Sequence, residues 1–150
     1  MTPPLPPPNS IALISCVKSK LDHPAPAAEL YTSALFKRQR EWAIARCGSW
    51  FILSAKHGLL RPNHVVAPYE LTLKRAPAVE RRAWSLRVLD QLRSQLHTLD
   101  GRYFEIYAGK DYCDDGLVDG LRYAGATVVL PWNGQSLGQR IAHKEYESRA

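Results

Sequence analysis

The sequence predicts a single α/β domain in which a mostly parallel sheet of at least four strands is covered by helices on both faces. Three observations predict this fold. Four short apolar runs are typical of buried strands, a polar loop follows each run, and a helical pattern follows each loop. The runs are residues 11–15, 50–54, 103–107 and 127–130. Because ligands bind such sheets where loops leave the carboxyl ends of the strands, we expect one site at that edge.

The segments between the apolar runs have helical spacing of apolar residues. Helices are expected over residues 30–46, 76–96, 112–124 and 136–147. Pro77 suits the first turn of the second of these helices. Residues 55–75 have no clear helical or strand pattern, and a connection of this length in a compact domain is usually functional or disordered.

Length and composition indicate one globular domain, residues 11–150, preceded by a proline-rich tail, residues 1–10, that we expect to be disordered. No apolar run approaches the roughly 20 residues of a membrane-spanning helix. The N-terminus also lacks the pattern of a secretory signal. The three cysteines include no C-x-x-C pair, which favours free thiols in the cytoplasm over a disulfide framework.

The chain is moderately basic, with a net charge of +6. A positive surface suits a polyanion such as DNA, RNA or a nucleotide. An excess of lysine and arginine is equally compatible with a surface that has no such partner. The charge alone leaves both interpretations open.

The loop after the first run contains Ser15, Lys18 and Lys20. Backbone amides and lysines at the end of a first strand can hold a phosphate group or the edge of a base. The loop matches neither the P-loop nor the glycine-rich dinucleotide motif, so no cofactor is expected. The alternative is a polar turn with exposed lysines.

The loop after the second run contains Ser54, Lys56 and His57, and Gly58 follows. An imidazole in this position can transfer a proton or donate a hydrogen bond to developing negative charge. Lys56 would supply fixed positive charge. An exposed turn without function is the alternative.

Two further candidates lie in the long connection, where Glu70 follows Tyr69. Glu70 is a candidate general base if a water molecule lies between it and the substrate. Tyr69 could stack on a nucleobase. Alternatively, Tyr69 belongs to the core and Glu70 is a surface charge.

The loop after the third run contains Gly109, Asp111 and Tyr112. A carboxylate at this position can activate water, and an aromatic ring can cover a base. The competing role for Asp111 is that of a helix N-cap. The chain has no established metal-binding motif, and nothing local supports a zinc site built from Cys16, His57 and Cys113, so no metal site is expected.

Five segments carry a family resemblance: residues 14–20, 30–36, 53–62, 68–73 and 134–140. Together they resemble a small bacterial domain family related to the YaaA peroxide-stress proteins. The resemblance extends over residues 11–141 and implies DNA binding and protection of DNA under oxidative stress.

Residues 106–112 are also similar to one strand and loop of the uracil-DNA glycosylases. The family's G-Q-D-P-Y-H loop has lysine for glutamine here, and its proline is missing. The likeness implies that Asp111 activates water and that Tyr112 shields the base. His57 would take the role of that family's later histidine.

We therefore expect a cytoplasmic DNA-binding protein of damage protection or repair, in its sharper form an N-glycosidase that removes a damaged base from DNA. The predicted phosphate contacts on two helices are Lys37, Arg38, Arg81 and Arg82. The alternatives are a hydrolase or transferase of free nucleosides or nucleotides, and a DNA-binding stress protein without catalysis. All three depend on positions 18, 57, 70 and 111 sharing one cavity at the edge of the sheet.

Overall fold

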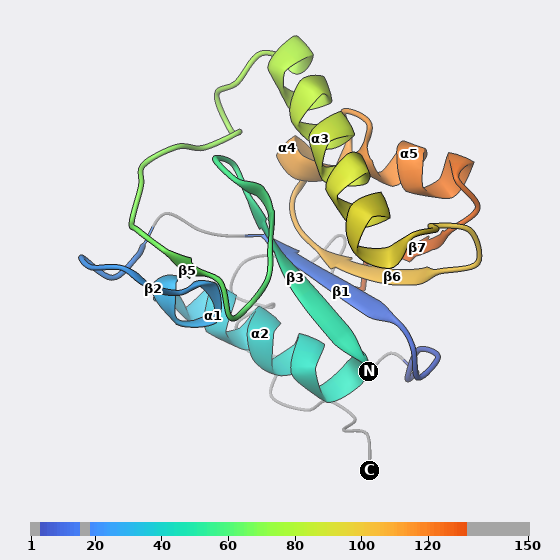
Figure 1. Cartoon of the computed structure of the whole chain (residues 1–150), viewed down its shortest axis with the longest axis horizontal. Helices are drawn as coiled ribbons and strands as arrows, with labels where there is room; N and C mark the ends of the chain where they lie inside the picture. The colour runs from blue at the N-terminus through green and yellow to red at the C-terminus, as the bar shows by residue number, and fades with distance from the viewer. Residues whose placement is uncertain (1–3, 16–18, 132–150) are drawn as a thin grey trace.

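A five-stranded sheet runs through the centre of the molecule, with the strand order β4-β3-β1-β6-β7 (Figure 1). The computed structural model describes residues 4–15 and 19–131. Four strands are parallel, and β4 at one edge pairs antiparallel with β3. The strands are β1 Ile11–Ser15, β3 Ser49–Ser54, β4 Gly58–Leu60, β6 Tyr103–Tyr107 and β7 Thr127–Val129. A second, two-stranded sheet pairs β2 Ala25–Pro26 with β5 Val65–Val66.

Strand β1 lies between two parallel neighbours, and this position explains its continuous apolar run. Leu13 is paired with Phe51 on one side and with Ile106 on the other. Successive side chains of a strand point to opposite faces, so Leu13 enters one core cluster and Ile14 enters the other. Both residues are fully buried.

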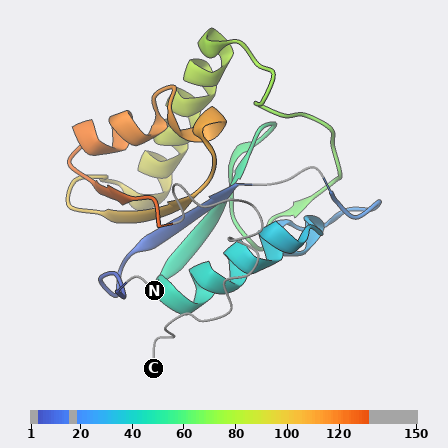
Figure 2. The same cartoon turned by 180° about the vertical axis from the view of Figure 1, so that it is seen from behind.

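Helices cover both faces of the sheet, as Figures 1 and 2 show from opposite sides. Helix α2, Ala34–Arg46, packs on one face, while α3, Ala78–Leu96, and α5, Leu117–Tyr123, pack together on the other. Two single-turn helices are α1, Ala27–Leu30, and α4, Lys110–Cys113. The predicted fold class is confirmed. Within the described residues, no helix is long and apolar enough to cross a membrane.

The helix predicted over residues 30–46 is shorter in the structure. Leu30 ends α1, and Tyr31 is extended. Helix α2 then begins after Ser33, whose hydroxyl accepts a hydrogen bond from the backbone N–H of Phe36 at 3.1 Å. A serine cap of this kind satisfies an amide that the first helical turn leaves unpaired, and it fixes the start of the helix.

Two other predicted segments also differ. The helix expected over residues 112–124 is divided into α4 and α5 at Gly116, whose φ of 128° interrupts helical geometry. The connection expected over residues 55–75 contains β4, because the chain turns back at Gly58 (φ 74°) to pair with β3, and it also contains β5, which pairs with β2. The helix expected over residues 136–147 lies outside the described residues.

Residues 4–10 of the proline-rich segment contact the domain. Pro6 and Ser10 are buried, and a guanidinium N–H of Arg46 donates to the backbone carbonyl of Pro4. Gly48 has no room for a side chain, since its Cβ would lie 2.5 Å from the carbonyl oxygen of Pro8. This part of the segment predicted to be a disordered tail therefore packs on the end of α2.

A buried ion pair joins α2 to β6. The Arg46 guanidinium donates to both carboxylate oxygens of Glu105, at 3.0 Å and 2.8 Å. The Tyr107 hydroxyl donates to the same carboxylate at 2.6 Å. All three residues are at most 2% exposed. Burial and the adjacent Glu105 charge raise the pKa of Tyr107 well above its usual range, so its hydroxyl remains a donor.

Candidate functional site

The carboxyl ends of β1, β3 and β6 meet at one edge of the sheet, where α2 and α3 begin. The chain moves from β1 to β3 on one side and then crosses to β6 on the other side of β1. Strand order therefore reverses at β1, with α2 and α3 on opposite faces. Open α/β sheets bind their ligands at such a reversal.

The turn between β3 and β4, residues 55–58, is held in place by α3. The Gln91 side chain donates to the carbonyl of His57 at 3.0 Å and accepts from the N–H of Leu59 at 2.8 Å. A Cβ at Gly58 would collide with the same amide group. Glycine is therefore needed both for its positive φ and for the close approach of Gln91.

Two more contacts fix the same turn. The Arg87 guanidinium donates to the carbonyl of Lys56 at 2.9 Å. The Ser54 hydroxyl accepts from the backbone N–H of His57 at 3.1 Å. Both candidate side chains of the turn, Lys56 and His57, thus project from a backbone fixed on two sides.

Beside this turn, three buried hydroxyl groups form a chain. The Tyr69 hydroxyl lies 2.7 Å from that of Tyr31 and 2.5 Å from that of Ser54. Tyr69 is only 9% exposed. The long connection is thereby attached to β3 and to the segment before α2.

Cationic and imidazole groups surround the Tyr69 ring. The ammonium groups of Lys20 and Lys56 lie 4.7 Å and 5.8 Å from the ring centroid. The His57 ring meets the Tyr69 ring edge to face, with centroids 5.3 Å apart. We call Lys20, Lys56 and His57, gathered around Tyr69, the basic rim.

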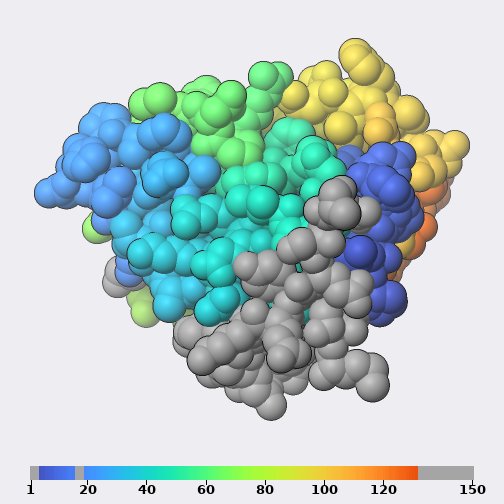
Figure 3. Space-filling model, turned by 90° about the horizontal axis from the view of Figure 1, so that it is seen from below, coloured from blue at the N-terminus to red at the C-terminus, as the bar shows by residue number. Residues whose placement is uncertain are grey.

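The basic rim combines segments that are distant in the sequence. The segment that follows Lys20 is joined to the connection that carries Tyr69 by two backbone hydrogen bonds, one between Ala27 and His64 and one between Ala28 and Pro62, each at 2.8 Å. Figure 3 shows the segments around residues 20–30 (sky blue) and 65–75 (green) next to each other at one end of the molecule.

The His57 imidazole is held in its neutral form near pH 7. Burial lowers the pKa of His57 below 6.5, and electrostatic interactions with Lys56, His64 and Arg87 lower it further. A neutral imidazole has one donor and one acceptor nitrogen, so it can donate a hydrogen bond or accept a proton.

Asp111 lies in the first turn of α4 and forms an ion pair. Nη1 of Arg81 is 3.0 Å from Oδ1 of Asp111, and Nε of Arg81 is 2.9 Å from Oδ2 of Asp115. Gly109, not Asp111, occupies the N-cap position of α4. The Asp111 carboxylate is therefore oriented by Arg81 on α3.

Trp84 links the Asp111 segment to the basic rim. Its indole N–H donates to the carbonyl of Ser54 at 2.8 Å. Its ring meets that of Tyr112 edge to face, with centroids 5.3 Å apart and planes at 77°. One side chain of α3 therefore contacts both the strand end before His57 and the helix that carries Asp111.

The comparisons with known proteins give a family. The chain belongs to DUF6884, a family of unknown function, over residues 11–145. No curated protein matches the chain, and no solved structure does either. The match begins at β1 and contains every described element of the sheet.

The structure of this DUF6884 chain brings together five of the residues proposed from the sequence: Lys20, Ser54, Lys56, His57 and Tyr69. Asp111 and Tyr112 lie in the neighbouring segment joined through Trp84. Ser15 is buried at the end of β1, whereas Glu70 and Gly109 are exposed. Lys18 lies outside the described residues. The cavity expected to be shared by positions 18, 57, 70 and 111 stays a prediction.

The four cations predicted to contact DNA come from two helices, and their contact with DNA stays a prediction. Lys37 and Arg38 lie on α2, whereas Arg81 and Arg82 lie on α3 across the sheet. Arg38 is paired with Glu41 at 2.7 Å. Lys37 and Arg82 are exposed.

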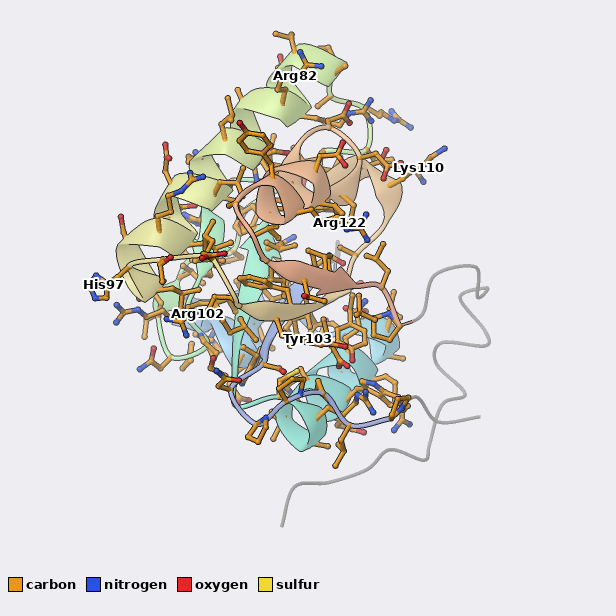
Figure 4. All side chains as sticks on the ribbon, turned by 90° about the vertical axis from the view of Figure 1, so that its right-hand side faces the viewer. Arg82, His97, Arg102, Tyr103, Lys110 and Arg122 are labelled. Carbon is orange, nitrogen blue, oxygen red and sulfur yellow. The ribbon has the colours of Figure 1, made fainter. Side chains whose placement is uncertain are left out.

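One further cation, Lys110, lies at the carboxyl edge of the sheet. Figure 4 shows Arg82 at the top of the molecule and Lys110 at the upper right, with His97 and Arg102 lower down on the left. Arg82 is in the first turns of α3 and Lys110 begins α4, so both extend the positive charge of the carboxyl edge.

Sequence reasoning missed the residues that hold the site together. These residues are Trp84, Arg87 and Gln91, all on α3. Each is more than 25 residues from its partner in the turn, and no local pattern reveals such a contact.

No group of three or more His, Cys, Asp or Glu in the described ranges is placed to hold a metal ion. Burial raises the pKa of the Cys113 thiol to about 12, and its sulfur lies 3.6 Å from the Ala108 carbonyl oxygen. A protonated thiol is a poor metal ligand and a poor nucleophile.

Proposed function

We propose that this DUF6884 protein binds DNA at the carboxyl edge of its sheet and acts in the protection or repair of damaged DNA in the cytoplasm. The observation that carries the proposal is the basic rim, in which Lys20 and the adjacent pair Lys56 and His57 come together around Tyr69 from three separate segments. Exposed Arg82 and Lys110 extend the positive edge. The net charge of +6 has the same sign.

The sharper form of the proposal is hydrolysis of an N-glycosidic bond. Asp111, oriented by Arg81, would direct a water molecule toward the sugar carbon of a nucleotide turned out of the helix. The bond from that carbon to the base nitrogen would break as the water oxygen bonds to the carbon, and the Asp111 carboxylate would accept the proton that this water loses. Neutral His57 and cationic Lys56 would stabilise the departing base anion, and Tyr112 would cover the base.

A second candidate is a hydrolase or transferase of free nucleosides or nucleotides. One observation favours it: the helix cations are divided between two faces, and Arg38 and Arg81 are occupied by carboxylates. The basic rim is compact, which suits a small phosphorylated ligand. Such an enzyme would convert free nucleotides and would be indifferent to DNA.

The catalytic proposal predicts a specific product. Oligonucleotides with single lesions, uracil among them, are incubated with the protein and then treated with alkali, which cleaves at abasic sites. We expect strand scission for at least one lesion, reduced by about 10²-fold or more in Asp111→Asn. Affinity for the oligonucleotide should change little in this variant. Absence of scission for every lesion contradicts the glycosidase proposal, and turnover of free nucleotides alone favours the second candidate.

The binding proposal predicts a steep dependence on salt. For duplex DNA, the logarithm of the association constant should fall with the logarithm of salt concentration by about 0.9 per phosphate neutralised. Lys56→Ala should reduce this slope by about one phosphate contact. Arg93→Ala is the matched control, because Arg93 lies in the last turn of α3, away from the edge. A slope near zero in the wild type contradicts DNA binding through phosphates.

A further inference from the structure

We propose that the basic rim is a proton-coupled oxyanion site, in which His57 takes up a proton when a phosphate group of a nucleotide or nucleic acid binds beside it. This inference rests on the proposed function and names the chemistry of the same site. The ligand is defined as an oxyanion of the phosphate class, whether it belongs to a DNA strand or to a small molecule.

The geometry keeps the imidazole in place. Gln91 and Ser54 hold the backbone of His57 on both sides, and Arg87 holds the carbonyl of Lys56. The ring also packs against Tyr69. The imidazole is therefore fixed beside Lys56 before any ligand arrives, which reduces the entropy lost when an anion binds.

The groups whose electrostatic effect lowers the pKa of His57 come from several elements. Lys56 belongs to the same turn, His64 to the segment after β4, and Arg87 to α3. The ammonium group of Lys20 lies over the Tyr69 ring, which His57 also contacts. Glu70, which follows Tyr69, is a carboxylate exposed to solvent.

This arrangement makes proton uptake depend on the ligand. In the free protein, burial and the surrounding cations keep the pKa of His57 below 6.5, so the ring is neutral at pH 7. A bound oxyanion opposes those cations and favours the imidazolium, which raises the pKa in the complex. Affinity should therefore increase as pH falls through the pKa of the complex, and it should level off below the pKa of the free protein.

The test uses the full chain and two probes that do not titrate between pH 5.5 and 8. One is a fluorescent single-stranded oligothymidylate, and the other is sulfate as its competitor. Affinity is measured at constant ionic strength across that range. We expect binding of both probes to strengthen toward pH 5.5, by at most about tenfold per pH unit for one proton.

Variants of His57 and His64 distinguish which imidazole takes up the proton. His57→Asn keeps a polar side chain that does not titrate, and it should bind with little dependence on pH. His57→Gln is a second version of the same test. His64→Asn, which removes the other imidazole of this region, should keep a pH dependence of the same steepness, shifted toward higher pH because a group that lowers the pKa of His57 is gone. Circular dichroism checks that each variant is folded.

The outcomes distinguish this inference from the proposed function. Binding of DNA that is equally strong at every pH overturns proton coupling and leaves DNA binding intact. A pH dependence that survives in both His57 variants also overturns it, as does a pH dependence seen with the oligonucleotide and not with sulfate. If wild-type protein binds neither probe at any pH, the proposed function and this inference both fail.

Discussion

Replacement of Glu105 by alanine is expected to lower the free energy of unfolding by about 3–5 kcal/mol, since it leaves a buried charge without its partner. Glu105 is 1% exposed and Arg46 is 0% exposed. The carboxylate accepts two hydrogen bonds from Arg46 and one from the Tyr107 hydroxyl. In Glu105→Ala the guanidinium would keep the hydrogen bond to the Pro4 carbonyl and the contact with the Trp42 ring, neither of which neutralises its charge.

A double variant separates the charge effect from a loss of packing. Arg46→Met with Glu105→Leu fills a similar volume without charge, and replacements of this kind often restore stability. We expect the double variant to unfold at a higher urea concentration than Glu105→Ala, with recovery limited by the hydroxyl of Tyr107 and the carbonyl of Pro4, which lose their partners. Urea unfolding followed by circular dichroism measures both variants. A loss below about 1 kcal/mol in Glu105→Ala would contradict a buried, desolvated ion pair.

Replacement of Trp84 by alanine is the second change with a large expected effect, about 3–5 kcal/mol of stability. Trp84 is 5% exposed and packs in the core between α3 and the sheet. It also joins the two segments of the candidate site, through the hydrogen bond to Ser54 and the ring contact with Tyr112. Both stability and ligand affinity should therefore fall.

Trp84→Phe tests the hydrogen bond between Trp84 and Ser54 without leaving a large cavity in the core. Phenylalanine keeps an aromatic ring against Tyr112 and removes the donor to the Ser54 carbonyl, so we expect a loss of about 1–2 kcal/mol. Oligonucleotide affinity should weaken in the folded variant, because the turn at residues 55–58 loses one support. Leu86→Ala, at an exposed position of the same helix, should stay within about 0.5 kcal/mol of wild type. Full affinity in Trp84→Phe would show that Trp84 does not position the site.

Most strands of this fold follow from local patterns, and the exceptions have identifiable causes. The four predicted strands agree with β1, β3, β6 and β7 to within one residue at each end. Strand β4 escaped prediction because Gly-Leu-Leu is short and pairs only at an edge. The break between α4 and α5 at Gly116 was not predicted, because the helical spacing of apolar residues continues across Gly116 although its φ is positive. Local spacing of apolar residues reports burial, but it does not report the order of strands or a change in backbone direction.

The candidate site also has features that follow from the sequence and features that depend on the tertiary structure. The sequence alone determined that Lys56, His57, Asp111 and Tyr112 follow strands, since an apolar run that ends in polar residues is a local signal. Only the tertiary structure decided that Tyr69 returns to the strand end beside His57, because that contact joins segments with no shared pattern.

The buried Glu105 shows the physical reason for this division most clearly. From sequence, it is one charged residue inside an otherwise apolar strand, and its burial has no local signal. Its partner Arg46 is 59 positions away, at the end of α2. Alternation along a strand and periodicity along a helix depend on neighbouring residues, so the sequence by itself determined the elements. The partners of each charge depend on how those elements pack, and that was decided only when the sheet and its two helical layers came together.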